Sequence, residues 1–303
     1  MSTTFPAGLS PGAAASLPEV LPPIRRRGWV RTAIHRHPTI VIGGLLLGAM
    51  VFIAIFAPWL GTTDPTAIAP AKRIRDPSAL YWMGTDMLGR DIYSRVMYGA
   101  RISLGVGFSV ALIGSAVGTL IGAIAGFSRS LDSIIMRVMD GLMSIPPILL
   151  AIALMALTRA SVQNVIIALS VPEFPRVARL IRGLVLSIRE QPFVEGAIAS
   201  GTRLPRLLLR HILPNTLAVL MVQATIIAAA AMINEAILSF IGAGTPPTIP
   251  SWGNIMAEGR ALWQIKPFIV FFPAIFLSVT VLSVNLIGDG LRDALDPRLA
   301  KRL

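Results

Sequence analysis

ISLGVGFSVALIGSAVGTLIGAIAGF, residues 102–127, contains no charged side chain and is longer than the roughly 20 residues that a helix needs to cross a bilayer. Gly114, Gly118, Gly122 and Gly126 recur at every fourth position and therefore lie on one stripe of that helix. Glycine lets another helix backbone approach closely. The stretch predicts a membrane-spanning helix that packs tightly, either against the rest of the chain or against another subunit.

The composition of the whole chain supports a helical membrane protein. Of 303 residues, 54% are hydrophobic and 14% are charged, whereas a soluble domain carries about 25% charged residues. Mean hydropathy is +0.72. The strand-like alternation of a membrane barrel is absent, so we expect an all-α fold.

The net charge of +12 is explained by topology rather than by a nucleic-acid partner. Basic residues collect in the cytoplasmic loops of membrane proteins. Segment 176–210 carries seven arginines and should lie on the same side as the five arginines of residues 25–36. An even number of crossings must separate the two segments, and a fourth span at about 162–181 supplies it.

We therefore predict six spans with both termini in the cytoplasm. The expected divisions are a cytoplasmic N-terminal tail (1–38), a first span with an extracytoplasmic loop (39–101), a core transmembrane domain (102–290) and a cytoplasmic C-terminal tail (291–303). The predicted spans are 39–60, 102–127, 141–158, 162–181, 212–240 and 267–288.

Three charged pairs have helical spacing. Asp86 with Arg90 and Asp91 with Arg95 are four residues apart, which predicts pairing on a helix face within the 61–101 loop. Arg137 and Asp140 are three apart and are expected to pair at the start of the third span.

VEGAIASGTRLPRLLLRHILP, residues 194–214, interrupts the apolar sequence with polar residues. We expect a short helix over 190–200, a left-handed turn at Gly201 and a second helix beginning near Pro205. Arg203, Arg206 and Arg210 would share one face of that helix, opposite Leu204, Leu208 and Ile212. Periodicity alone leaves two interpretations, an amphipathic surface helix or a docking element for a cytoplasmic partner.

The sequence lacks the residue patterns of an enzyme. It contains no cysteine, and none of its three histidines forms an HExxH pair. It has no GxSxG elbow and no GxxxxGK[ST] phosphate loop, so we expect this chain to bind neither a metal nor ATP.

Ionisable and amide side chains within the spans are candidates for a polar pathway. Glu235 is the deepest, and Asn234 shares a helix face with Gln223. Asp140 is a fourth candidate. Interhelical hydrogen bonding is the alternative for these residues. The spans contain no chain of carboxylates of the kind that relays protons, which disfavours a secondary transporter.

The 194–214 segment resembles the EAA loop of binding-protein-dependent ABC importer permeases. Glu195, Gly196-Ala197, Gly201 and Leu213-Pro214 stand at the matching spacing. Gly196 departs from the family's usual Ala, and His211 replaces its usual Ile, as in peptide-type members that read HILP. Arg203 stands where a capping Ser is common.

Three further stretches are similar to the C-type subunit of dipeptide, oligopeptide and nickel permeases. They are WMGTDMLGRDIYSRVMYGARISL (82–104), NEAILSFIGAGTPPTIPSWGNIMAEGR (234–260) and NLIGDGLRDALDPR (285–298).

The resemblance implies a type I ABC importer permease with a cytoplasmic coupling loop at 190–214, in the bacterial inner membrane. It implies a second permease subunit, two cytoplasmic ATPase chains that bind ATP and Mg, an extracytoplasmic solute-binding protein and surrounding lipid. Docking would fall on Glu195, Gly196, Ala197, Gly201, Arg206, His211, Leu213 and Pro214. Di- or oligopeptides are the leading solute, with nickel, glutathione or opine-like compounds as alternatives. A standalone channel or secondary transporter is the alternative from another class.

Overall fold

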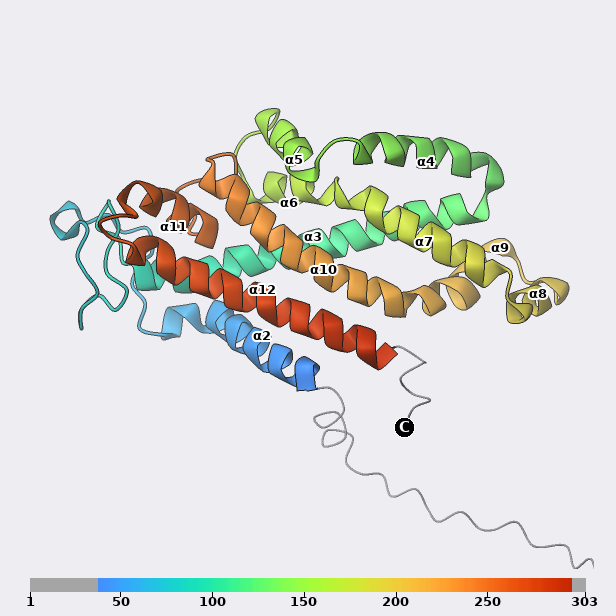
Figure 1. Ribbon diagram of the computed structural model, residues 1–303, viewed down its shortest axis with the longest axis horizontal. Coiled ribbons are helices and arrows are strands. Elements are labelled where there is room, and N and C mark those ends of the chain that lie inside the picture. Colours follow the sequence, from blue (N-terminus) through green and yellow to red (C-terminus); the bar gives the residue numbers. More distant parts are fainter. Residues whose placement is uncertain (1–37, 296–303) are drawn as a thin grey trace, which may run out of the picture. The chain divides into compact units, whose positions relative to one another are not determined.

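The structure is a computed structural model that describes residues 38–295, and every named element in this range is helical. The all-α prediction is confirmed for this part of the chain (Figure 1). The predicted N-terminal tail and most of the predicted C-terminal tail lie outside the described residues. The α-helices are α2 (Pro38–Phe56), α3 (Ile92–Phe127), α4 (Arg129–Met143), α5 (Pro147–Ala156), α6 (Val162–Ser170), α7 (Glu173–Arg189), α8 (Pro192–Ala199), α9 (Leu204–Leu207), α10 (Leu213–Phe240), α11 (Trp252–Gly259) and α12 (Phe268–Leu295).

Helix α3 is the centre of the bundle. It packs against α2, α7 and α10, and α12 in turn packs against α2 and α10 (Figure 1). The short helix α11 contacts α3, α10 and α12 at one end of the bundle. The helices that the sequence places far apart are thus held together through one long, glycine-rich helix.

The glycine stripe of α3 packs against α7 of the same chain. A Cβ added at Gly118 would lie 2.5 Å from the Cβ of Val177, and one at Gly126 would lie 2.9 Å from the Cβ of Val185. A Cβ at Gly122 would collide with the carbonyl oxygen of Ala178. Of the two interpretations of the stripe, intramolecular packing is confirmed, because α7 occupies the space that a partner subunit would need.

The predicted membrane-spanning helices are confirmed, but the count of six is not matched in the described range. Four continuous helices in the described range are long and apolar enough to cross a membrane, and a fifth candidate is the broken pair α4–α5, bent by 86°. The break lies at Ser144–Pro146, and Pro147 begins α5; as expected from proline's missing amide and its clash with the preceding turn, the helix does not continue straight through this pair. The continuous candidates are Pro38–Trp59, Ile92–Phe127, Pro205–Phe240 and Phe268–Leu295.

The predicted fourth span, 162–181, is not one helix. It comprises α6 and the first half of α7, with Val171 and Pro172 between them. Helix α5 contacts α6, and α4 contacts α7, so the two broken segments lie side by side. Helix α12 also continues to Leu295, past the boundary predicted at residue 290.

Two of the predicted helical charge pairs are wrong. Asp91 does not pair with Arg95 but caps the N-terminus of α3, where its side chain accepts a hydrogen bond from the Ser94 amide at 2.9 Å. Asp140 pairs with Arg179 of α7 at 2.6 Å, and not with Arg137.

The third pair is present, but in a different setting. Asp86 and Arg90 are 2.7 Å apart as predicted, yet they belong to the loop before α3 and not to a helix.

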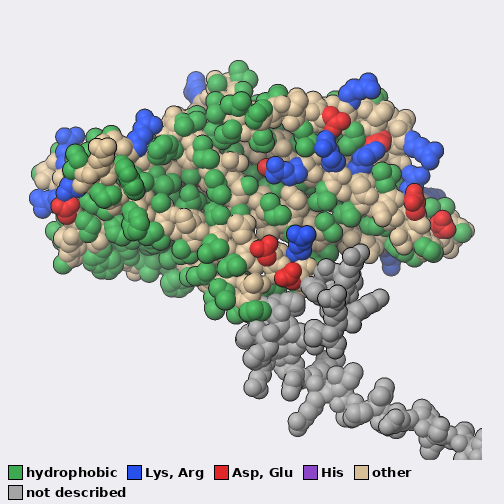
Figure 2. All heavy atoms as spheres, viewed as in Figure 1, with side chains coloured by type: hydrophobic (Ala, Val, Ile, Leu, Met, Phe, Trp, Pro, Cys, Tyr) green, Lys and Arg blue, Asp and Glu red, His purple; other side chains and the backbone are tan. Residues whose placement is uncertain are grey.

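The surface of the described chain is mainly apolar. Figure 2 shows hydrophobic side chains over much of one face, with charged side chains at its left-hand edge and over its right-hand half. Exposed large apolar side chains include Leu45, Leu112, Leu120 and Ile167. Such exposure suits contact with lipid or with a second membrane subunit.

Candidate functional site

The first candidate site is the hairpin formed by residues 190–214, hereafter the hairpin. Helix α8 ends at Ala199, and Gly201, two residues further on, has the predicted left-handed conformation with a φ of +77°. The Gly201 amide donates to the Ile198 carbonyl at 2.9 Å, and the Thr202 amide donates to the Ala197 carbonyl at 3.1 Å. This pair of bonds is the Schellman arrangement, which satisfies carbonyls that the helix end leaves free. The turn reverses the chain sharply and sets the angle between the two arms.

The second arm of the hairpin is not a separate helix. Helix α9 continues through a π-helical turn, Leu208–Ile212, directly into α10. Pro214 is the second residue of α10 and directly follows the π-turn, and the helical path continues through it. The second helix of the predicted hairpin and the fifth predicted span therefore form one continuous rod from Pro205 to Phe240.

Three apolar side chains fix the hairpin to the bundle. Val194, Leu207 and Ile212 are almost completely buried. The predicted apolar face included Leu208, which is only half-buried, because the wider π-turn changes the angular position of the residues it contains.

The predicted docking residues lie mostly on the outside of the hairpin. Glu195 is exposed in the first turn of α8, and Gly196 and Gly201 face open space. Arg206 and Pro214 are exposed, and Ala197, His211 and Leu213 are half-buried. The structure thus places the motif residues at one end of the helix bundle, around one tight turn.

The predicted pathway residues do not come together. Asp140 is exposed on α4 and is paired with Arg179. Gln223 and Asn234 are half-buried on α10, so their pathway role stays a prediction. Glu235 is fully buried on a different side of α10, where α10 meets α3 and α11.

Glu235 belongs to a buried hydroxyl cluster. Its carboxylate accepts hydrogen bonds from the Ser239 hydroxyl at 2.9 Å and from the Ser103 hydroxyl of α3 at 3.4 Å. The hydroxyls of Ser239 and Thr245 are 3.2 Å apart, and Thr245 is 3.3 Å from the Ser251 hydroxyl. The alternative of a satisfied interhelical hydrogen bond therefore describes Glu235 in this structure.

A second polar group, hereafter the ion-pair cluster, was found by sequence reasoning only in its Asp86–Arg90 pair. It contains Asp86, Arg90, Arg95 and Glu258. Arg95 contacts Asp86 at 2.6 Å and Glu258 at 2.5 Å, and Arg90 contacts the same two carboxylates at 2.7 and 2.5 Å. Glu258 comes from α11, 163 residues after Arg95, so no local spacing rule connects them. The only signal in the sequence is that both family-like stretches, 82–104 and 234–260, contain these residues.

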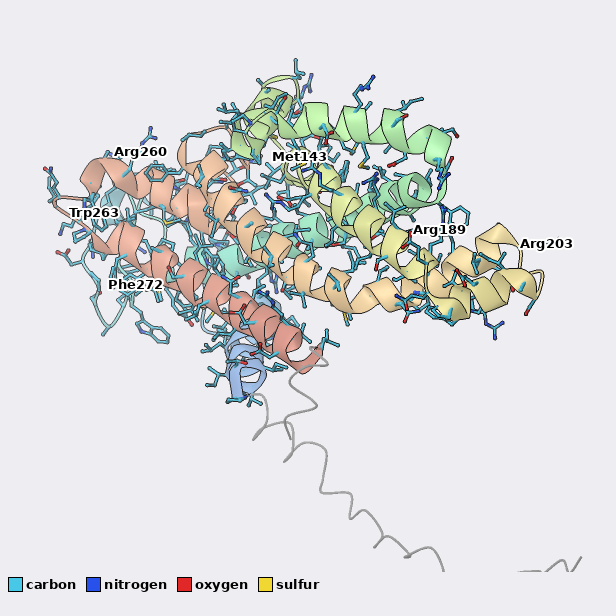
Figure 3. All side chains as sticks on the ribbon, turned by 45° about the vertical axis from the view of Figure 1, so that its right-hand side comes forward. Met143, Arg189, Arg203, Arg260, Trp263 and Phe272 are labelled. Atoms are coloured by element: carbon cyan, nitrogen blue, oxygen red, sulfur yellow. The ribbon has the colours of Figure 1, made fainter. Side chains whose placement is uncertain are left out.

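The hairpin and the ion-pair cluster lie at opposite ends of the bundle. Figure 3 shows Arg189, which precedes the hairpin, and Arg203, which lies within it, far from Arg260 and Trp263, which follow the α11 helix that supplies Glu258. A polar surface at each end, joined by long apolar helices, is the arrangement of a protein that spans a membrane.

Comparison with known proteins agrees with this geometry. The family model described as "binding-protein-dependent transport system inner membrane component" matches residues 118–301. The chain belongs to this family. A second model, the N-terminal transmembrane domain of oligopeptide transport permease C, matches residues 30–77, which is consistent with a C-type subunit.

Relatives within the binding-protein-dependent transport family are similar over nearly their whole length. A probable peptide ABC transporter permease of Sinorhizobium fredii is 52% identical over 93% of this chain and 96% of the relative. A dipeptide transport system permease of Alkalihalophilus pseudofirmus is 40% identical over 88% of each chain. A glutathione transport system permease of Escherichia coli is 40% identical over 91% of this chain and 94% of the relative.

Solved structures support the fold of this family member. A chain of the inward-facing MetNI methionine ABC transporter matches with a TM-score of 0.56 and 19% identity, over 68% of this chain and 98% of that chain. The protein is therefore an integral membrane permease subunit of an ABC importer, and it is a transport protein and not an enzyme.

Proposed function

We propose that this chain forms a translocation path for di- or oligopeptides together with a second permease subunit, in the plasma membrane of a bacterium. Peptide and dipeptide permeases among the relatives support this solute class. Glutathione, itself a small peptide, is the second candidate, because a 40% identical relative is named for it.

The observation that carries the proposal is the exposed hairpin. Glu195, Arg203, Arg206 and Arg210 are exposed, and none of them makes an ion pair with another described residue of the chain. The apolar anchors beneath them keep the hairpin in place, and the charges above them are available to another protein. We assign this surface to two cytoplasmic ATPase chains, one on this subunit and one on its partner.

The energy source would come from those partners. The sequence has no phosphate-cradling loop, so ATP and Mg would be bound by the ATPase chains and no cofactor by this one. A solute-binding protein would deliver the peptide at the opposite end of the bundle.

Reconstitution tests the proposal. Vesicles containing both permease subunits and both ATPase chains, with the binding protein outside and ATP inside, should accumulate labelled peptide. Vesicles that lack the ATPase chains should not. Peptide uptake by this chain alone, without nucleotide, would instead establish the standalone channel or secondary transporter.

The proposed orientation has both termini in the cytoplasm, with the hairpin on the same side. Because the chain has no native cysteine, single cysteines are specific probes. Leu80→Cys and Ile265→Cys replace exposed residues at the end of the bundle that contains the ion-pair cluster. Ile198→Cys replaces an exposed hairpin residue. In intact cells an impermeant maleimide should label the first two and leave Cys at 198 unlabelled until the membrane is permeabilised. Labelling at 198 in intact cells would show that the hairpin faces the outside and that the proposed orientation is wrong.

A further inference from the structure

A polar pocket lies at the end of the bundle that holds the ion-pair cluster. Its volume is about 210 Å³, and it opens between the end of α10, the loop that follows it and α11. Its wall also includes Ala160, from the connection between α5 and α6. The polar side chains that line it are Ser239, Thr245, Asn254, Glu258 and Arg260.

The pocket is held open by its own hydrogen bonds. The Asn254 side-chain amide donates to the Thr245 hydroxyl at 2.8 Å and to the carbonyls of Pro246 and Ile249 at 3.0 and 3.1 Å. Gly242 has a φ of +86°, and Gly244 lies so close to Ser239 that any side chain would collide. The loop is thus fixed from both sides, and a ligand would meet a preformed site.

The charges around the pocket leave one positive group uncommitted. Asp86 and Glu258 balance Arg90 and Arg95 within the ion-pair cluster, so these four groups sum to zero. Arg260 is additional. Its guanidinium donates to the Phe240 carbonyl at 3.0 Å and lies 5.8 Å from the centre of the Phe240 ring.

A guanidinium has five N–H groups, and the remaining ones of Arg260 have no acceptor among the described residues of the chain. The guanidinium lies within cation–π distance of the Phe240 ring and is exposed at the pocket wall, where its other N–H groups can reach a ligand. Carboxylates are the natural ligand, because guanidinium and carboxylate bond in a paired, planar geometry.

We propose that this pocket binds the carboxylate end of the transported solute through Arg260, with the hydroxyls and amide of the pocket around it. The peptide identity of the solute rests on the proposed function above, whereas the recognition of a carboxylate rests on the pocket. A volume of 210 Å³ is below the roughly 300–1,000 Å³ of pockets that enclose a drug-sized ligand, so it holds one end of a peptide and not the whole molecule.

The pocket is unsuited to the opposite charge. Its carboxylate, Glu258, already accepts bonds from two arginines, and Arg260 would repel an amino group or a metal cation. The C-terminal end of a peptide is therefore the end that enters.

Cysteine protection tests the site directly. Ala160→Cys places a thiol on the pocket wall at an exposed position. In the purified transporter complex without ATP or binding protein, the dipeptide Ala-Ala should slow labelling by an impermeant maleimide. N-acetyl-Ala-Ala, which keeps the carboxylate, should protect equally, and the C-terminal amide of Ala-Ala should not protect.

The control positions separate the pocket from general effects. Leu157→Cys is exposed in the same connection but does not line the pocket, and its labelling should not respond to any of the three compounds. Arg260→Gln in the Ala160→Cys background should raise the half-protecting concentration of Ala-Ala at least about tenfold, as loss of a charged hydrogen bond predicts. Arg73→Gln removes an exposed arginine that likewise donates to a backbone carbonyl, and it should leave protection unchanged.

Each part of the proposal has an outcome that would overturn it. Equal protection by the amidated dipeptide overturns carboxylate recognition, and absence of protection by Ala-Ala overturns the pocket. Unchanged protection in Arg260→Gln overturns the role of that residue. Peptide uptake by the same complex is measured separately, so normal uptake without protection rejects only the pocket, whereas failed uptake with protection rejects the proposed transport function.

Discussion

The ion-pair cluster and the hairpin handle charge in opposite ways. In the cluster, Arg95 is 1% exposed and lies between two carboxylates of the same chain. In the hairpin, Arg203, Arg206 and Arg210 are exposed and make no ion pair among the described residues. A buried charge without a partner is strongly destabilising, because it has lost its hydration. An exposed charge remains hydrated, so it can stay unpaired until another protein binds. The comparison teaches that the charges at one end of the bundle are neutralised within this chain, whereas those in the hairpin are left for another protein to pair with.

The largest expected loss of stability comes from disrupting the ion-pair cluster. Arg95→Met removes the central cation of the cluster and leaves Asp86 and Glu258 with Arg90 alone. We expect it to lower the free energy of unfolding by about 3 kcal/mol, because two carboxylates, one of them fully buried, are left to share one arginine. The midpoint of thermal unfolding of the detergent-purified chain measures this.

The matched control for Arg95→Met is Asp76→Asn. Asp76 pairs with Lys266 at 2.5 Å at the same end of the bundle, but its side chain is 68% exposed. The unfolding midpoint should hardly change, since solvent screens an exposed pair. Equal losses from the two variants would remove the distinction between buried and exposed charge.

A smaller effect is expected in the helix that joins the two ends. Gly122→Ala puts a methyl group against the Ala178 backbone of α7 and should cost about 1–3 kcal/mol through overpacking. Gly105→Ala changes the same helix where nothing lies within 4 Å, so it should leave the unfolding midpoint unchanged or higher. If Gly122→Ala were as stable as Gly105→Ala, the α3–α7 contact would be looser than the structure shows.

The smallest stability effect, with the largest functional one, is expected in the hairpin. Gly201→Val should cost about 1–2 kcal/mol, because a side chain is strained at positive φ. It should also turn the second arm away from the docking surface, so that the ATPase chains no longer co-purify and uptake is lost while membrane insertion stays normal.

Gly61→Val is the matched control for Gly201→Val. Gly61 has a φ of +71° and open space around it, but it lies in the loop after α2, away from the hairpin. Similar strain should give a similar loss of stability with full retention of the ATPase chains. Full uptake in Gly201→Val would show that the hairpin is only a surface helix.

Sequence reasoning predicted the features that depend on local composition. The long apolar helices, the close packing of the Gly114–Gly126 stripe and the left-handed turn at Gly201 each follow from residues near one another in the chain. Features that depend on distant partners were missed. Arg95 was assigned to Asp91, four residues away, whereas the fold places it against Glu258.

The fourth span shows a different limit. Segment 162–181 was drawn as one helix because charge distribution required a crossing there, yet Val171-Pro172 divides it into α6 and α7. The count of charges constrains how often a chain crosses, but not whether each crossing is continuous. The π-turn at Leu208–Ile212 was missed for a related reason, since its residues have no composition that distinguishes them from an ordinary helical turn.

The continuity of the hairpin with α10 has a mechanical consequence. The rod from Pro205 to Phe240 has 36 residues, which at the rise of an α-helix makes a lever about 54 Å long. A tilt of about 10° at its hairpin end sweeps the other end through about 9 Å, as follows from that length. The far end carries Ser239 and Phe240, two residues of the pocket wall. A tilt of this rod at the hairpin would therefore change the shape of the pocket at its other end.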